Sequence, residues 1–232
     1  MKFGGIQKLT LIDYPGKIAT TLFVYGCNFK CRFCYNSDLV LSNPNTNKSF
    51  LSEEEIFSFL EERKGFLEGV VLCGGEPTIY PDLPDFTEKI KQMGYKVKLD
   101  TNGSNPEMLH YLIKKKLIDY VAMDIKAPKD KYPKVVQCKV SIEKIEKSIT
   151  LLKESNLDYE FRTTVVPTLL EKDDIIQIAK WLKGAKKYVL QQFQPGNTVD
   201  PSFSNIKPYP EEYLVSIHQS IAFYFQSCEI RL

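Results

Sequence analysis

Three cysteines in one short stretch are the residues of this sequence best suited to chemistry. Cys27, Cys31 and Cys34 stand at C-x3-C-x2-C spacing. Three thiolates held so close together suit a metal ion or an iron–sulfur cluster, and a disulfide would leave one thiol over. A structural zinc site normally has four protein ligands, and no fourth cysteine or histidine lies near this stretch. The spacing therefore predicts a metal or cluster with an open coordination position, where a substrate can bind.

A buried strand is expected to carry this cysteine loop. Thr20 to Tyr25 are mostly apolar and β-prone, and Gly26 ends the run. Similar short apolar runs recur along the chain. They predict further strands at Gly69–Cys73, Tyr95–Leu99, Tyr120–Met123, Tyr159–Val166, Tyr188–Phe193 and Cys228–Leu232.

Amphipathic helices are expected between these strands. Ser52 and Glu55 have the spacing of a capping box, so a helix should begin there. The other expected helices cover Leu83–Met93, Asn105–Lys115, a segment from Ser141, Glu171–Leu182 and Glu211–Phe225. Irregular structure is expected for the lead-in Met1–Lys17, the polar stretch with Pro44, and the loops Ala127–Val140 and Gln194–Pro208.

Strands and helices that alternate in this way favour the α/β class. Strict alternation indicates a parallel sheet with right-handed crossovers. Six such units, rather than eight, predict an open, partial (β/α)6 TIM-like barrel. No change of composition and no low-complexity linker interrupts the sequence, so we expect a single domain over residues 1–232.

The composition excludes several classes of protein. Hydrophobic residues make up 43% of the chain, enough for a proper core. The net charge is +2, from 31 basic and 29 acidic residues, so no nucleic acid or membrane partner is expected. The N-terminus does not resemble a signal peptide, and no apolar run is long enough to span a bilayer. Six cysteines without a secretion signal favour a reducing, cytoplasmic location.

Unusual polar and glycine residues fall where the expected strands stop. The second strand is followed by Gly74-Gly75-Glu76-Pro77, the third by Asp100 and Thr101, and the fourth by Asp124. Arg162 lies in the fifth strand and Gln192 near the end of the sixth. Because the carboxyl ends of parallel strands carry the functional residues of such folds, we expect these side chains on one rim.

The cysteine spacing, with aromatic Phe33 before the last cysteine, resembles the signature of the radical S-adenosylmethionine (SAM) enzymes. The wider block Asp13 to Asn36 is similar to the activating enzymes of glycyl-radical proteins, especially the activators of anaerobic ribonucleotide reductase. Tyr35 departs from the pattern, since relatives often carry histidine there. The resemblance implies a radical SAM-type barrel with a 4Fe-4S cluster and SAM as its cofactors.

The resemblance also implies roles for the residues at the strand ends. Cys27, Cys31 and Cys34 would hold the cluster, and Phe33 would lie with the SAM-binding residues. The motif Gly74-Gly75-Glu76-Pro77 would bind the methionine ammonium group, largely through backbone carbonyls. Asp100, Thr101 and Asp124 would form a small monovalent cation site beside the SAM carboxylate. From their places in the strands, and not from the resemblance, Arg162 is expected either to contact SAM or to be an edge residue, and Gln192 is expected to hydrogen-bond the ribose hydroxyls.

The implied reaction is reductive cleavage of SAM to methionine and a 5′-deoxyadenosyl radical. That radical would take a hydrogen atom from a backbone glycine of a partner, for which anaerobic ribonucleotide reductase is expected. The electron would come from a donor such as flavodoxin or ferredoxin. The cofactor supplies the difficult chemistry, while the protein supplies orientation and exclusion of water and oxygen.

Other readings of the same residues stay open. A small-molecule radical SAM enzyme, such as one that makes a deazapurine, would have a closed pocket and no protein partner. A non-catalytic zinc or iron–sulfur module would not bind SAM, and the ordered motifs at the strand ends argue against it. A protein-interaction domain with unrelated cysteines is a third alternative.

Overall fold

The computed structural model describes residues 1–40 and 50–232, which cluster into two compact units. The first unit comprises Met1–Asn28, Asp38–Thr101 and Glu107–Val121, and the second comprises Phe29–Ser37, Asn102–Pro106 and Ala122–Leu232. The single domain expected over residues 1–232 stays a prediction. Pro44, where a helix break was expected, lies outside the described residues.

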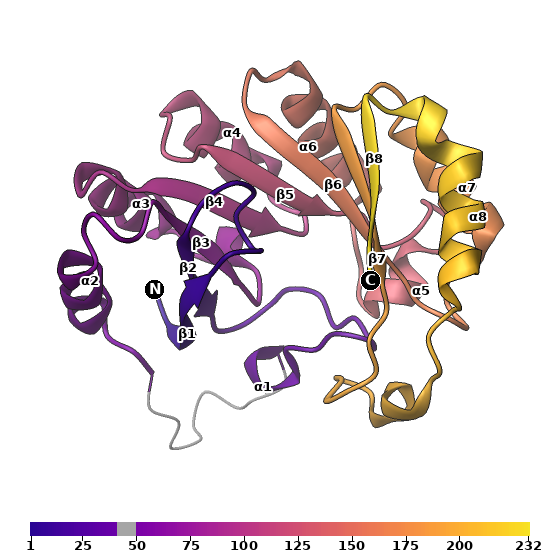
Figure 1. Cartoon of the computed structure of the whole chain (residues 1–232), viewed down its shortest axis with the longest axis horizontal. Helices are drawn as coiled ribbons and strands as arrows, with labels where there is room; N and C mark the ends of the chain where they lie inside the picture. The colour runs from indigo at the N-terminus through magenta and orange to yellow at the C-terminus, as the bar shows by residue number, and fades with distance from the viewer. Residues whose placement is uncertain (41–49) are drawn as a thin grey trace. The chain divides into compact units, whose positions relative to one another are not determined.

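The first unit contains a sheet whose strands follow the order of the chain (Figure 1). The strands are β1 (Phe3–Thr10), β2 (Ala19–Val24), β3 (Gly69–Gly74) and β4 (Lys96–Thr101). β2, β3 and β4 are parallel, and Val24 pairs with Gly74 at their carboxyl ends. The loops after β2 and β3 therefore start side by side, which positions the residues before the cysteines against the glycine motif.

The first strand, β1, corrects the irregular lead-in expected for Met1–Lys17. β1 pairs antiparallel with β2, in register at Ile6 with Leu22, with irregularities on either side. The segment contains two glycines, Gly4 and Gly5, and only weak alternation, which disfavour a strand when it is judged alone. Pairing with a buried neighbouring strand supplies the stability that the local sequence lacks.

Short helices connect the strands of the first unit. Their bounds are α1 (Ser37–Val40), α2 (Glu53–Glu62), the 3₁₀ helix η1 (Pro77–Ile79), α3 (Leu83–Gln92) and α4 (Pro106–Lys114). The capping box predicted for α2 is confirmed. Ser52 Oγ accepts from the Glu55 N–H at 3.1 Å, and Glu55 Oε2 accepts from the Ser52 N–H at 2.8 Å.

The second unit repeats the strand-then-helix pattern. Its strands are the end of β5 (Tyr120–Asp124), β6 (Asp158–Val165), β7 (Lys187–Gln192) and β8 (Ser227–Arg231), and β6, β7 and β8 are parallel. The helices are α5 (Tyr132–Val136), α6 (Ile142–Glu154), α7 (Lys172–Trp181), η2 (Pro201–Asn205), α8 (Glu211–Ile221) and η3 (Ala222–Tyr224). α7 and α8 lie side by side next to β7 and β8 (Figure 1).

These elements confirm the predicted α/β class with parallel strands. α5 is a correction, because it lies within Ala127–Val140, which was expected to be a loop. The segment contains Pro133, which the first turn of a helix tolerates. Within the described ranges, no helix has the length and apolar character needed to cross a bilayer.

Asp119, just before β5, binds residues of both β4 and α3 in the first unit. Its carboxylate accepts from Lys91 Nζ at 2.6 Å, from the Val97 N–H at 2.8 Å and from Lys96 Nζ at 3.0 Å. Burial alone would raise the pKa of Asp119, but the hydrogen bonds from Lys91, Val97 and Lys96 outweigh it and lower the pKa.

The pH dependence of stability should therefore change when Asp119 is replaced with asparagine. The ionised carboxylate is favoured in the folded chain, so its stabilisation is complete above an unfolded-state pKa of about 4 and is lost as the pH falls further. We expect Asp119→Asn to lower the free energy of unfolding by about 2 kcal/mol at neutral pH and by much less near pH 3. Urea unfolding across this pH range measures the free energy of unfolding of both chains. An equal loss of stability at both pH values would contradict the ion-pair explanation.

Candidate functional site

The glycine motif after β3 packs directly against the residue before the first cysteine. Gly74 has a φ of 106°, a conformation that side chains rarely adopt. The Gly75 N–H donates to Val24 O at 2.9 Å, and the Glu76 N–H donates to Gly26 O at 2.9 Å. A Cβ atom on Gly75 would lie 1.8 Å from Gly26 O. The absence of a side chain at Gly75 is therefore what allows this backbone contact.

The Glu76 side chain joins the glycine motif to the end of β4. It is 1% exposed, and Oε1 accepts from the Thr78 N–H at 3.1 Å, from Thr78 Oγ1 at 2.6 Å and from Thr101 Oγ1 at 2.7 Å. Glu76 and Thr101, both expected at the SAM site, are thus linked to each other. Sequence reasoning missed this network, because glutamate is not one of the residues preferred at the N-cap position that Glu76 occupies before η1.

Removal of the Glu76 carboxylate should destabilise the first unit. Glu76→Ala leaves the buried donors of Thr78 and Thr101 without their acceptor, which should lower the free energy of unfolding by about 3 kcal/mol. Glu76→Gln keeps one acceptor oxygen and should cost about 1 kcal/mol. Urea unfolding measures both, with Glu88→Ala on the exposed face of α3 as the control. A Glu76→Ala variant as stable as the control would show that the network contributes nothing.

The cysteine loop is held from two sides within the second unit. On one side, the Lys30 N–H donates to Val136 O at 2.9 Å. On the other side, the Val199 N–H donates to Cys34 O at 3.1 Å and the Asp200 N–H donates to Arg32 O at 2.9 Å. The Arg32 guanidinium also binds the Asp200 carboxylate, at 2.6 and 2.7 Å. The polar loop after β7 therefore fixes the backbone between Arg32 and Cys34.

The thiols of Cys31 and Cys34 fit a metal cluster in type and in burial. Burial raises the pKa of Cys31 to about 12, and burial also raises the pKa of Cys34. Such thiols carry their protons at neutral pH and give them up on binding a metal. No disulfide joins the cysteines, all six of which are described. Cys27 belongs to the first unit, and in the described part of the chain no three His, Cys, Asp or Glu side chains are gathered as a metal site.

Asp124 ends β5 between two cationic side chains of the second unit. Arg162 Nε lies 2.8 Å from Asp124 Oδ1, and Lys126 Nζ lies 3.0 Å from Oδ2. Burial works against ionisation of Asp124, but the Arg162 and Lys126 charges hold its pKa well below the usual range. Lys126 Nζ also lies 6.0 Å from the centroid of the Phe33 ring, so it connects this carboxylate to the cysteine loop.

Gln192 and Tyr35 meet the polar loop that follows β7. Gln192 Nε2 donates to Tyr209 O at 2.6 Å, while its buried Oε1 has no hydrogen-bond partner among the residues that the structure describes. The ring of Tyr35 stacks on Phe193, with centroids 6.1 Å apart, and its hydroxyl accepts from the Gln194 N–H at 2.7 Å. A buried acceptor that lacks a donor fits a ligand hydroxyl group.

The expected site residues are distributed between the two units. The first unit holds Cys27, the glycine motif, Asp100 and Thr101, and the second holds Cys31, Phe33, Cys34, Asp124, Arg162 and Gln192. Within each unit, the structure joins Glu76 to Thr101 and Arg162 to Asp124. Sequence reasoning missed Asp200, which binds Arg32, and Lys98, which forms an ion pair with Asp100. The roles of the expected site residues as cofactor ligands stay predictions.

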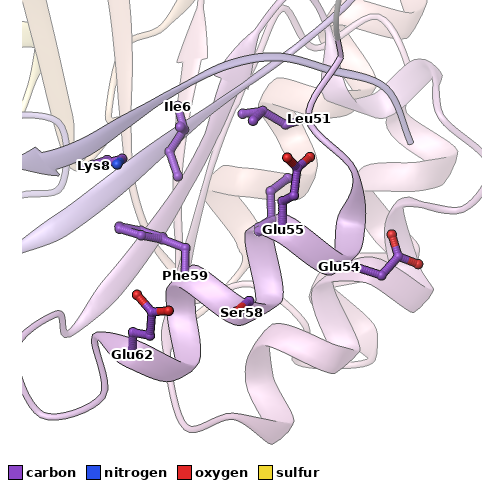
Figure 2. A pocket seen from close by; sticks show the side chains of 9 residues that line it. Ile6, Lys8, Leu51, Glu54, Glu55, Ser58, Phe59 and Glu62 are labelled. Carbon is purple, nitrogen blue, oxygen red and sulfur yellow. The ribbon is translucent and has the colours of Figure 1, made fainter.

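One pocket of the first unit is lined by other residues. Figure 2 shows side chains of β1 and α2 facing each other across it. It has a volume of about 540 Å³ and is lined by Ile6, Lys8, Leu51, Glu54, Glu55, Ile56, Ser58, Phe59 and Glu62. It contains none of the residues expected to bind the cluster or SAM.

Parallel strands with glycine and acidic residues at their ends, and a loop with three cysteines, define the class of cluster-binding α/β enzymes. Residues 21–189 match the family description "Radical SAM superfamily". The chain therefore belongs to the radical SAM superfamily, and the predicted enzyme class is confirmed. Membership implies a 4Fe-4S cluster and SAM as cofactors.

Individual relatives support this family assignment, and a solved structure shares the fold. The chain is 41% identical over 213 residues to "Putative glycyl-radical enzyme activating enzyme MJ1227" of Methanocaldococcus jannaschii, which covers 90% of this chain and 86% of the relative. It is 27% identical over 199 residues to the pyruvate formate-lyase-activating enzyme of Clostridium pasteurianum, with 84% and 81% covered. Streptococcus suis SuiB bound to S-adenosylmethionine has the same fold, with a TM-score of 0.66, 16% identity, and 91% and 52% covered.

Proposed function

We propose that this chain is the activating enzyme of a glycyl-radical enzyme. The observation that carries the proposal is its 41% identity to the Methanocaldococcus jannaschii relative along nearly the whole of both chains. The Clostridium pasteurianum relative, an activating enzyme by name, supports the same class. The finer part of the proposal is the partner, anaerobic ribonucleotide reductase, which rests on the resemblance of Asp13 to Asn36 to its activators.

In this proposal the cysteine loop holds the 4Fe-4S cluster through Cys27, Cys31 and Cys34. When bound and reduced, the cluster supplies the electron for cleavage of SAM. The chain's own contribution is to fix the ligands. The hydrogen bonds from Val199 and Asp200 hold the backbone of Cys34 and Arg32, so this part of the loop is fixed before a cluster binds. The burial of Cys31 also keeps water away from the cluster.

We propose that residues at the strand ends bind SAM. The resemblance implies that the glycine motif presents backbone groups to the methionine ammonium, and the missing side chains of Gly74 and Gly75 allow the motif to pack on Val24 and Gly26. The Arg162 guanidinium, which binds Asp124 through Nε, is the kind of group that suits the SAM carboxylate. The Oε1 atom of Gln192 is an acceptor for a ribose hydroxyl. The resemblance adds a monovalent cation at Asp100, Thr101 and Asp124.

The electron donor and the location complete the proposal. A small flavodoxin or ferredoxin would reduce the cluster, since the sequence has one cysteine motif of this kind and no second cluster motif to relay electrons. Flavodoxin and ferredoxin are proteins of the cytoplasm, where we place this chain.

The test is anaerobic reconstitution with the candidate partner. The chain is loaded with iron and sulfide and reduced, and SAM is added with or without anaerobic ribonucleotide reductase. We expect 5′-deoxyadenosine to form and a glycyl radical signal to appear on the reductase in electron paramagnetic resonance. SAM cleavage that transfers no radical to any glycyl-radical enzyme would favour a small-molecule substrate. A well-formed cluster that never cleaves SAM would leave only a cluster-binding module.

A further inference from the structure

The pocket between β1 and α2, called the β1–α2 groove from here on, is partly apolar (Figure 2). Four of its nine lining residues have apolar side chains: Ile6, Leu51, Ile56 and Phe59. Ile56 is buried, but the other three are only half-buried. Their apolar atoms still contact water, so a partner that covered them would gain free energy from the hydrophobic effect.

Acidic side chains dominate the polar part of the groove. From α2 it is lined by Glu54, Glu55 and Glu62, and Lys8 on β1 is the one basic residue among the nine that line it. Three carboxylates and one ammonium group give the lining residues a formal charge of −2. The whole chain carries +2, so this negative charge is particular to the groove.

Neighbouring side chains do not cancel this charge. Glu54 and Glu62 are exposed, and neither forms an ion pair with another residue that the structure describes. Lys8 is also exposed, and it has no ion pair within the described ranges. Glu55 accepts from the Ser52 N–H at 2.8 Å, and a neutral backbone donor leaves the negative charge of the carboxylate in place. The groove therefore presents negative charge beside apolar surface.

Exposed apolar side chains follow the groove along both of its elements. Leu9, Leu11 and Ile12 come after the part of β1 that lines the groove, and they are 57%, 69% and 82% exposed. Phe66, which follows α2, is 73% exposed. Large apolar side chains that are exposed together mark an interaction surface. A surface of this extent suits a polypeptide better than a small molecule.

We propose that the β1–α2 groove binds a basic amphipathic segment of the partner glycyl-radical enzyme, in which lysine or arginine side chains stand beside apolar ones. Its apolar side chains cover Ile6 and Phe59, and its cationic groups face Glu54 and Glu62. Complementary charge of this kind steers association and suppresses wrong partners, so an acidic protein surface is repelled. The inference rests on the proposed function, since activation of a partner requires this chain to hold a protein substrate.

Biolayer interferometry under anaerobic conditions tests the inference, with anaerobic ribonucleotide reductase immobilised and the reconstituted full chain in solution. Two changes alter the groove in different ways: Glu54→Lys with Glu62→Lys reverses its charge, and Ser58→Trp fills it. We expect each change to raise the dissociation constant by about tenfold or more. SAM cleavage without the reductase should stay within about twofold of the unchanged rate, because the groove contains none of the residues expected to bind the cluster or SAM.

The matched control is Glu88→Lys with Glu107→Lys, which reverses two exposed charges of the first unit outside the groove. Glu107 lies in the first turn of α4, as Glu54 does in the first turn of α2, so both pairs of changes disturb a helix N-terminus alike. The control should bind the reductase as tightly as the unchanged chain. Added salt should weaken both of them more than it weakens the chain with the reversed groove.

The outcomes separate this inference from the proposed function. Groove variants that bind the reductase as tightly as the unchanged chain would overturn the inference, while a glycyl radical on the reductase would leave the proposed function intact. An equal loss of binding in the control would also overturn the inference, because net charge alone would then explain the effect. An unchanged chain that neither binds nor activates the reductase would overturn both.

Sedimentation of the chain alone tests the other occupant. A dimer that Ser58→Trp dissociates would assign the groove to a second copy of this chain and would overturn the inference. The charge reversal at the exposed positions Glu54 and Glu62 decides if Ser58→Trp does not fold.

Discussion

Replacing any one of Cys27, Cys31 and Cys34 with alanine is expected to remove the bound cluster and reduce SAM cleavage below about 1% of the unchanged rate. Loss of an outer-shell partner of a metal ligand already costs 10–100-fold, and loss of a ligand itself costs more. Cys31 is buried, and its pKa of about 12 shows how poorly the site accepts an uncompensated charge. Visible absorption of the reconstituted protein, iron content and 5′-deoxyadenosine formation measure the effect.

The matched control is Cys228→Ser in β8. Cys228 lies in β8, outside the cysteine motif, so it is not expected to bind the cluster. This variant should keep its iron content and its cleavage rate. A variant of Cys27, Cys31 or Cys34 that retained both would show that the spacing does not mark a cluster site. Equal losses in all four variants would indicate that the cysteines matter only for folding.

Gly75→Ala is expected to have the second largest effect, although it adds a single methyl group. That Cβ would lie 1.8 Å from Gly26 O and 2.5 Å from the Gly26 carbonyl carbon, and both are backbone atoms. The loop after β3 must then move away and lose its hydrogen bonds to Val24 and Gly26. Overpacking together with lost hydrogen bonds should lower the free energy of unfolding by about 3–5 kcal/mol.

Gly75→Ala should also lower the rate of SAM cleavage by about 100-fold or more. Gly26 directly precedes Cys27, and a shift of about 1 Å at a reacting centre lowers a rate by about 100-fold. Urea unfolding and 5′-deoxyadenosine formation check the two effects. The control is Gly5→Ala in β1, where an added Cβ meets no atom within 4 Å. This change should alter stability by less than about 0.5 kcal/mol. If the two alanine variants proved equally stable and active, the contact between Gly75 and Gly26 would not be needed.

The local sequence is sufficient to predict most of the elements and the chemistry of the loop. The helix at Glu53–Glu62 begins at a capping box whose two hydrogen bonds join residues three apart. The parallel strands β2 and β3 appear as short apolar runs because both of their faces are buried. Cys27, Cys31 and Cys34 stand in one short segment, so their spacing alone indicates a cluster. These signals are local, and so they can be read before any tertiary contact is known.

Other features need partners that are distant in the chain. β1 contains Gly4 and Gly5 and becomes a strand only through pairing with β2. The Arg32–Asp200 ion pair, which fixes the cysteine loop, joins residues 168 positions apart. No periodicity of the sequence encodes such a contact, because it depends on where the fold brings two surfaces together.

The sequence by itself determined the family, the class of fold, and the residue types that are expected to hold a cluster and SAM. The tertiary structure alone decided which of these residues form hydrogen bonds or ion pairs with other side chains of the chain. In the structure, Glu76 accepts hydrogen bonds from Thr78 and Thr101, and Asp100 forms an ion pair with Lys98. The physical reason is that a buried charge or donor must find its partner in space. The sequence records that Lys98 carries a charge, whereas only the packed β4 shows that this charge is buried against Asp100.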